Sequence, residues 1–119
     1  MQVLFHHIYE YKKGLRHLVL HTLNASFRER AEKRLQQQEI DYVVREVTPS
    51  KINIFFGDKE CVDIIREIGN KKLNEFTPEE DFVLGTMLGY DHLQQCKRYL
   101  QKKEQEQIRL FSFLSTKTA

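Results

Sequence analysis

Three runs of apolar residues in the first half of the chain predict β-strands. The segment RHLVLHTL at residues 16–23 is rich in leucine and valine, and the breaker KKG at residues 12–14 precedes it. Two further runs, YVVREV at 42–47 and INIFF at 52–56, are joined by TPSK, in which Pro49 suits the second position of a turn. These two runs are therefore predicted to form a β-hairpin.

Helical periodicity predicts a helix before that hairpin. Ser26 can cap a helix over residues 26–38, because good helix formers follow it. Phe27, Ala31 and Leu35 recur at every fourth position and so share one face of this helix.

Capping residues also mark the helices that follow the hairpin. Asp58 can cap a helix that Gly69 ends, and Thr77 begins the sequence TPEE, which offers a threonine cap, a proline at the first helical position and a capping-box glutamate. Gly89 can end that helix and Asp91 can begin a last one. The apolar side of the last helix is predicted to consist of Leu93, Cys96, Tyr99 and Leu100. The N-terminal segment fits either a strand or a helix by spacing, and we expect a helix.

This order of elements predicts an α/β (α+β) fold with a βαββα core and about five helices. At 119 residues the chain, residues 1–119, is expected to be a single small domain, since either half would be too small to bury an adequate core. A right-handed crossover sets the first two strands parallel, and the hairpin sets the third antiparallel, so we expect a three-stranded mixed sheet. Such a sheet leaves one face or edge poorly covered.

The C-terminal segment, residues 104–119, is unusually apolar. IRLFSFLS at 108–115 carries five large apolar residues, which a monomer does not leave in water. We expect this segment to dock on the core or on a partner, and we favour a homodimer. The expected interface consists of Tyr99, Leu100, Ile108, Leu110, Phe111, Phe113 and Leu114.

Charge and cysteine usage narrow the class of protein. Residues 1–96 carry 13 Lys and Arg against 15 Asp and Glu, whereas residues 97–119 carry 6 against 2. That basic end favours only weak nucleic-acid binding, because nucleic-acid-binding domains usually have a pI above about 9. No apolar run approaches the roughly 20 residues that cross a bilayer. The segment MQVLFHHIYEY lacks the basic-then-apolar layout of a secretory signal, and the two cysteines form no CxxC pair. We expect a cytoplasmic protein without a membrane partner.

Histidines and tyrosines are the candidate functional groups. His17 and His21 are about 13 Å apart on one strand face at roughly 3.3 Å per residue, so they cannot share a metal ion, and no metal is expected. These groups can instead line a ligand or acid–base pocket, or form an aromatic cluster at an interface. The candidate pocket or interface comprises His6, His7, Tyr9, Tyr11, His17, His21, Tyr90 and Asp91.

The sequence favours a protein that is not an enzyme. It contains no glycine-rich phosphate loop, GxSxG elbow or HExxH pair. Cys61 lies near a helix start, where the dipole lowers a thiol pKa, but it shares an apolar stripe, which favours an inert thiol. We name no catalytic residue and no cofactor.

Three segments of the chain together resemble a known family: HHIYEYKKGLRHLVLHTL, VTPSKINIFFGDKEC and TPEEDFVLGTMLGYDHLQQCKRYL. They are similar to a small bacterial family catalogued as a domain of unknown function, numbered two-zero-two-three, over residues 1 to about 103. The resemblance implies three strands with five helices, homodimers, and members encoded beside a flavodoxin, which points to a flavodoxin-type redox partner.

Three hypotheses on function remain open. The first is a non-catalytic, cytoplasmic, homodimeric interaction or regulatory module, with a flavodoxin-type protein as a candidate partner. The second is a small-ligand or redox enzyme that uses the His/Tyr cluster. The third is a weak nucleic-acid binder that acts through the basic C-terminal helix.

Overall fold

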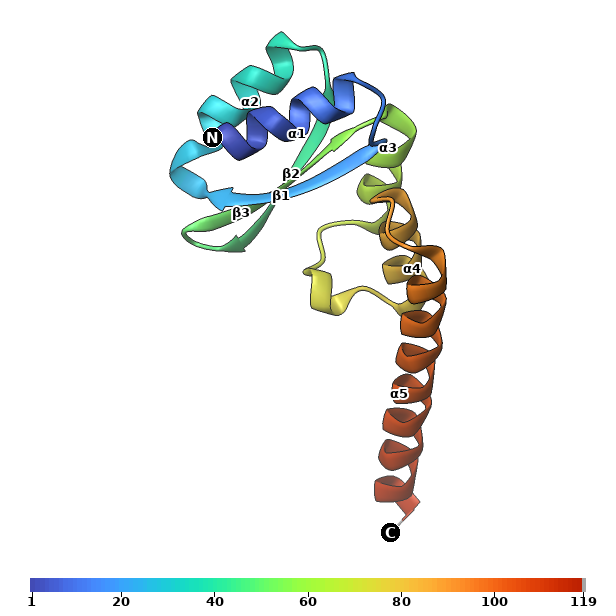
Figure 1. Cartoon of the computed structure of the whole chain (residues 1–119). Coiled ribbons are helices and arrows are strands. Elements are labelled where there is room, and N and C mark those ends of the chain that lie inside the picture. Colours follow the sequence, from blue (N-terminus) through green and yellow to red (C-terminus); the bar gives the residue numbers. More distant parts are fainter. Residues whose placement is uncertain (119) are drawn as a thin grey trace.

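The computed structural model describes residues 1–118, with side chains as far as Ser115. This part of the chain contains three strands and five α-helices in the predicted order, and the N-terminal segment is a helix, as expected (Figure 1). The elements are α1 (Gln2–Lys12), β1 (Leu18–Asn24), η1 (Ala25–Phe27), α2 (Arg28–Gln37), β2 (Asp41–Thr48), β3 (Lys51–Gly57), α3 (Lys59–Ile68), η2 (Leu73–Glu75), α4 (Pro78–Met87) and α5 (His92–Thr118), where η marks a short 3-10 helix.

The three strands form one antiparallel sheet in the order β1-β3-β2. β3 pairs with β2 through the predicted hairpin, and its other edge pairs with β1, so Phe56 lies opposite both Val19 and Tyr42. β1 and β2 run in the same direction, as expected, but they are not neighbours. The prediction of a mixed sheet is therefore wrong, because β3 lies between the two parallel strands and makes both pairs antiparallel.

Side chains alternate along β3 between two apolar clusters. Ile54 and Phe56 point toward α1 and α2, whereas Phe55 points toward α3 and α4. The first cluster consists of Leu4, Ile8, Val19, Ala31, Leu35, Ile40, Ile52, Ile54 and Phe56. The second consists of Leu18, Phe55, Val62, Ile65, Leu84 and Leu88. Helices therefore cover both faces (Figure 1), where the sequence predicted a poorly covered face or edge, because α3 and α4 pack on the face opposite α1 and α2.

The start of α4 and the corner between α4 and α5 are built as predicted. Thr77 Oγ1 accepts a hydrogen bond from the Glu80 backbone N at 3.1 Å, and Glu80 Oε1 accepts one from the Thr77 backbone N at 2.9 Å, which is a complete capping box. Gly89 follows α4 with a φ of 82°. Asp91 Oδ2 then accepts from the Gln94 backbone N at 2.9 Å and caps α5.

Two other predicted side-chain caps are not formed, although Asp58 is the N-cap residue of α3 as predicted. Asn24 Oδ1 accepts from the Ser26 backbone N at 2.9 Å and caps a 3-10 turn, so α2 begins at Arg28 and not at Ser26. The Asp58 side chain makes no capping bond to α3. It is directed instead toward Tyr11 and His17, to which it is hydrogen-bonded.

α5 is a single helix of 27 residues, about 40 Å long at 1.5 Å per residue. Its first turns are held on α4, since the rings of Phe82 and Tyr99 lie 5.7 Å apart and Arg98 forms an ion pair with Asp81 at 2.7 Å. Its later turns project away from the sheet (Figure 1), which gives the molecule extents of 59 × 33 × 22 Å. No helix in the described part of the chain is long and apolar enough to cross a membrane.

Removing the capping box should destabilise the protein measurably. Thr77→Ala deletes the side-chain acceptor for the first turn of α4, so we expect the free energy of unfolding to fall by about 1 kcal/mol. Thr77→Ser is the matched control, because it keeps the hydroxyl. Urea unfolding followed by circular dichroism measures both, and equal losses in the two variants would contradict the assigned role of the hydroxyl.

Candidate functional site

Two of the predicted histidines meet between α1 and the sheet. The rings of His7 on α1 and His21 on β1 have centroids 5.3 Å apart, and Arg16 Nη1 donates to His7 Nδ1 at 3.2 Å. An arginine can only donate, so this nitrogen of His7 is the acceptor. Burial, and then the neighbouring His7, lowers the pKa of His21 below its ordinary value. The contact is therefore suited to packing by a neutral His21 ring.

Four further candidates lie away from this contact. On α1 the His6 side chain is 68% exposed and Tyr9 is exposed, with Lys13 Nζ over the Tyr9 ring at 5.4 Å. Tyr90 and Asp91 lie at the α4–α5 corner, which packs on the opposite face of the sheet. The structure thus does not gather the eight candidates into one pocket. Among the described residues it also brings together no group of three side chains able to hold a metal ion.

A third place joins Tyr11 and His17 through a carboxylate. Tyr11 Oη donates to Asp58 Oδ1 at 2.9 Å, and His17 Nδ1 donates to Asp58 Oδ2 at 2.8 Å. Burial, and then the hydrogen bond with Asp58, raises the pKa of Tyr11 to about 12. The phenol therefore stays protonated and serves as a donor to the carboxylate.

The backbone around Gly57 fixes this three-residue cluster. The Asp58 backbone N donates to His17 O at 2.8 Å, and a Cβ at Gly57 would overlap that carbonyl oxygen. Asp58 was missed as a site residue because a carboxylate at a helix start is explained locally as a cap. The antiparallel pairing of β1 with β3 would have indicated this role of Asp58, because it sets the start of β1 beside the end of β3.

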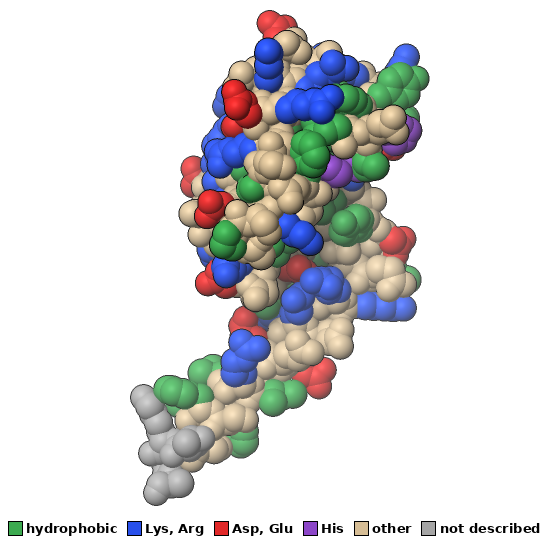
Figure 2. Space-filling model, turned by 90° about the vertical axis from the view of Figure 1, so that its left-hand side faces the viewer, with side chains coloured by type: hydrophobic (Ala, Val, Ile, Leu, Met, Phe, Trp, Pro, Cys, Tyr) green, Lys and Arg blue, Asp and Glu red, His purple; other side chains and the backbone are tan. Residues whose placement is uncertain are grey.

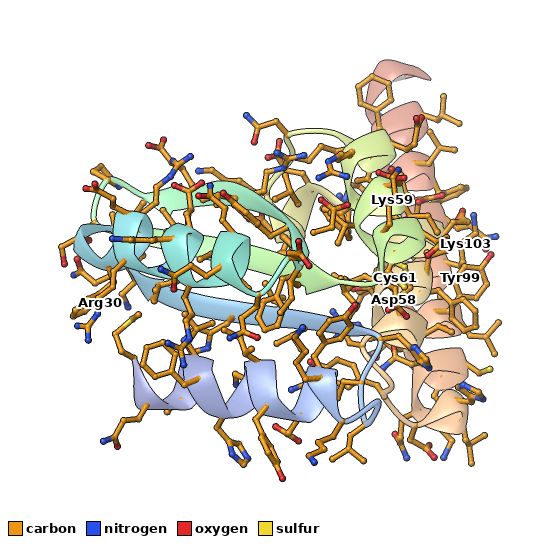
Figure 3. The ribbon with its side chains drawn as sticks, turned by 90° about the horizontal axis from the view of Figure 1, so that it is seen from above. Arg30, Asp58, Lys59, Cys61, Tyr99 and Lys103 are labelled. Carbon is orange, nitrogen blue, oxygen red and sulfur yellow. The ribbon has the colours of Figure 1, made fainter. Side chains whose placement is uncertain are left out.

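The cluster orients a base but supplies no activated nucleophile. Asp58 holds one nitrogen of His17, whose side chain is 76% exposed, and leaves Nε2 available for proton transfer. Cys61 lies one turn into α3, and Figure 3 shows it beside Asp58. Burial, followed by the charges of Asp58 and Glu60, raises the pKa of the Cys61 thiol. That direction agrees with the inert thiol that the sequence favoured.

α5 turns its polar side toward the body of the protein. Gln95 is only 8% exposed, whereas Leu93 and Leu100 are 61% and 66% exposed. Cys96 is exposed as well. Of the four residues predicted to form the apolar side, Tyr99 packs on α4, while the other three face away from the core. Packing of the polar Gln95 against α4 decides this orientation.

The outward apolar positions continue toward the end of α5. Leu110 and Leu114 extend the spacing set by Leu93, Cys96 and Leu100, and all four leucines are more than half exposed. Alternating steps of three and four residues are the spacing of a coiled-coil seam, which is interrupted here at positions 103 and 107. Ile108, Phe111 and Phe113 are also exposed. Figure 2 shows hydrophobic side chains gathered on the projecting end of the molecule.

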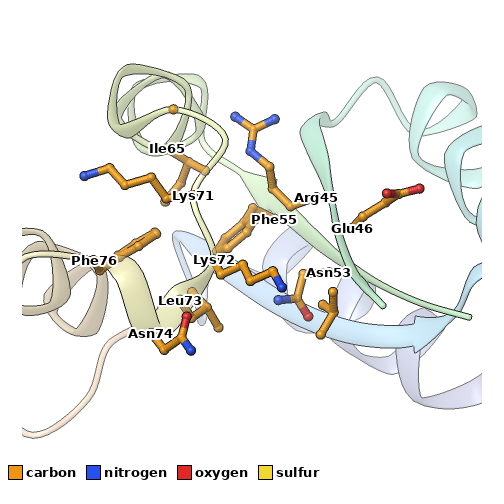
Figure 4. A pocket seen from close by; sticks show the side chains of 12 residues that line it. Arg45, Glu46, Asn53, Phe55, Ile65, Lys71, Lys72, Leu73, Asn74 and Phe76 are labelled. Carbon is orange, nitrogen blue, oxygen red and sulfur yellow. The ribbon is translucent and has the colours of Figure 1, made fainter. Parts of the chain in front are cut away.

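A cavity of about 210 Å³ opens between the sheet and the segment that joins α3 to α4 (Figure 4). Phe55, Ile65 and Phe76 give it an apolar lining, and Arg45 and Lys72 also line it. Within the described part of the chain, Arg45 makes no ion pair, and its Nε is buried without a hydrogen-bond partner. The sequence did not indicate this cavity, because no linear pattern places the α3–α4 connection over β2.

Comparison with known proteins identifies a family and no activity. Residues 2–102 match the model of a family described as a protein of unknown function, DUF2023. No curated protein matches the chain at significant similarity. The match therefore covers the sheet, the first four helices and the part of α5 that packs on α4.

The depressed pKa of His21 makes stability depend on pH. As the pH falls through the ordinary histidine value, the unfolded chain takes up a proton at His21 that the folded chain disfavours, so the free energy of unfolding decreases. We expect this loss between about pH 7.5 and about pH 5.5, and we expect His21→Leu to reduce it. Urea unfolding at the two pH values tests this, with His6→Gln as the control from the exposed side of α1. An unchanged pH dependence in His21→Leu would refute the prediction.

The unpaired guanidinium nitrogen of Arg45 is expected to lower the stability of the fold. An unsatisfied buried polar group costs roughly 1–3 kcal/mol, so we expect Arg45→Met to raise the free energy of unfolding by about 1 kcal/mol. Arg30, which is exposed on α2 over the other face of the sheet, provides the control Arg30→Met, expected to change stability by less than about 0.5 kcal/mol. Destabilisation by Arg45→Met would show that the guanidinium has a favourable role.

Proposed function

The chain belongs to DUF2023, a family of unknown function, so its role has to be inferred from its own surface. We propose that it is a non-catalytic, cytoplasmic interaction module that pairs with a second copy through α5. The observation that carries this proposal is the outward apolar seam of α5, defined as Leu93, Cys96, Leu100, Leu110 and Leu114. A polar inner side and an apolar outer side are the reverse of what a helix on a monomer's surface requires.

The second copy is favoured because the seam can pack against itself. Two such helices each bring leucines to matching seam positions, as in a two-stranded coiled coil. Complete burial of a leucine contributes about 1.5–3 kcal/mol, so burial of leucines already half exposed contributes on the order of 1 kcal/mol each. Phe111 and Phe113 flank the seam and would add to the buried area.

The charges and thiols of the chain support the same proposal. Arg98 and Lys103 on α5 are ion-paired with Asp81 and Glu79 on α4, which leaves less positive charge for a nucleic-acid backbone. Both cysteines are free thiols, as is usual in a reducing compartment. For a partner outside the dimer we retain the flavodoxin-type redox protein that the sequence resemblance implied, since a module without its own chemistry acts through what it binds.

Changes in the seam should convert a dimer into a monomer. We expect the full chain to have twice its mass of 14.3 kDa by size-exclusion chromatography with light scattering. The double variant Leu100→Glu with Leu110→Glu places like charges in the seam and should have the monomer mass. Truncation after Lys103, which removes the second half of the seam, should do the same.

The matched control introduces the same charges beside the seam. Gln94→Glu with Gln101→Glu changes two exposed positions of α5 and should leave the dimer intact. Circular dichroism checks that every variant keeps the fold. A wild-type chain that is monomeric at all accessible concentrations, or a seam variant that still dimerises, would overturn the proposal.

A further inference from the structure

Gln95 is a buried polar side chain without a partner at the α4–α5 corner. It is 8% exposed, and its side-chain amide forms no hydrogen bond with any described residue. The amide atoms of Gln95 are nevertheless still accessible from outside. In the described part of the chain, the only fully buried side-chain nitrogen or oxygen without a hydrogen-bond partner is Arg45 Nε. A buried amide left unpaired is costly, so an acceptor and donor supplied from outside would stabilise it.

The corner is shaped to hold this amide in place. Gln95 lies directly on Gly85 of α4, where a Cβ would overlap its Oε1. Gly85 has an ordinary helical backbone, so its glycine is explained by the close approach of Gln95 and not by φ. The two glycines of the corner thus have different roles. Gly89 ends α4, and Gly85 leaves space for the side chain of Gln95.

Gln95 lines a cavity of about 470 Å³. Leu20 of β1, Phe76, Leu84 and Leu88 give it apolar walls. Tyr90, one of the residues predicted from the sequence, also lines it. A volume of this size lies within the range of about 300–1,000 Å³ found for small-molecule pockets. The cavity shares Phe76 with the smaller cavity of Figure 4, so the α3–α4 connection is the wall between the two.

The charges around the cavity favour an anion. Arg98 donates from Nε and Nη2 to both oxygens of Asp81, at 2.7 and 3.0 Å, so that pair is neutral overall. Lys102 also lines the cavity, is half-buried and forms no ion pair with a described residue. One positive charge therefore remains uncompensated beside the apolar walls.

We propose that this cavity binds a small planar organic anion with a lactam edge, that is, an N–H group beside a C=O group. A lactam and a primary amide pair through two hydrogen bonds, which satisfies both functions of Gln95. The apolar walls accept the ring, and Lys102 accepts the negative charge. This binding is separate from the pairing of α5, because Gln95 lies on the inner side of that helix and the seam lies on the outer side.

Three probe compounds separate the parts of this recognition. Orotate carries a lactam edge and a carboxylate, uracil carries only the lactam edges, and benzoate carries only the carboxylate. Titration of the ¹⁵N-labelled full chain, followed by NMR, should show orotate binding more tightly than either of the others. The side-chain amide signal of Gln95 should shift with orotate and uracil, and it should shift less with benzoate.

Substitutions assign each contact. Gln95→Leu should weaken orotate binding about tenfold, the value of roughly one net hydrogen bond to a polar partner, and should leave benzoate binding unchanged. The matched control Gln94→Leu changes the neighbouring exposed glutamine and should bind like the wild type. Lys102→Met should weaken orotate and benzoate but spare uracil, with Lys97→Met as its exposed control.

Three outcomes would overturn the proposal. They are the absence of any shift with all three probes, equal affinity for orotate and benzoate, and orotate binding by Gln95→Leu at wild-type strength. Lys102→Met keeps the test decisive if Gln95→Leu does not fold, because the Lys102 side chain is only half-buried and forms no hydrogen bond or ion pair with a described residue.

Discussion

The position of β3 between two other strands constrains every other part of this fold. All of its residues from Ile52 to Gly57 are buried, and its two edges are both hydrogen-bonded. A strand covered on both faces needs apolar side chains on both, and IFF at 54–56 supplies them without alternation. The two apolar clusters lie on opposite faces of the sheet and both include side chains of β3, so the α1–α2 layer and the α3–α4 layer each depend on the same six residues.

Close approaches at two glycines position the two polar sites described above. At Gly57 the end of β3 touches the start of β1, and Asp58 consequently meets His17 and Tyr11. At Gly85 the polar side chain of Gln95 packs into the space that a larger residue would fill. In each case a glycine leaves space for a polar neighbour. The Asp58 carboxylate is satisfied by hydrogen bonds, whereas the Gln95 amide is not. That difference is why the second place, and not the first, carries the ligand proposal.

α5 connects the interior of the protein to its proposed partner. Its first turns are held on α4 by contacts that Arg98, Tyr99 and Lys103 make with that helix. These contacts set the direction of the projecting part. The exposed apolar positions of the seam recur at steps of three and four residues, because a side chain three or four residues along returns to nearly the same side. Figure 3 shows Tyr99 and Lys103 on the helix that runs beside α4. A ligand on the inner side and a second copy on the outer side would therefore act on opposite sides of one rigid helix.

Local patterns were sufficient for the elements and most of their ends. The strands, the hairpin, the last four helices and the capping box at Thr77 follow from neighbouring residues, so the sequence alone predicted them, whereas the spacing in α1 also fitted a strand. The order of the strands, the role of Asp58 and the orientation of α5 depend on residues distant in the chain, and here prediction was wrong or incomplete. Leu93, Cys96 and Leu100 form an apolar side whatever surrounds them, but only packing against Gly85 determines that Gln95 faces inward and that this side faces out. Periodicity defines which residues share a face of a helix, and tertiary contacts alone decide what that face meets.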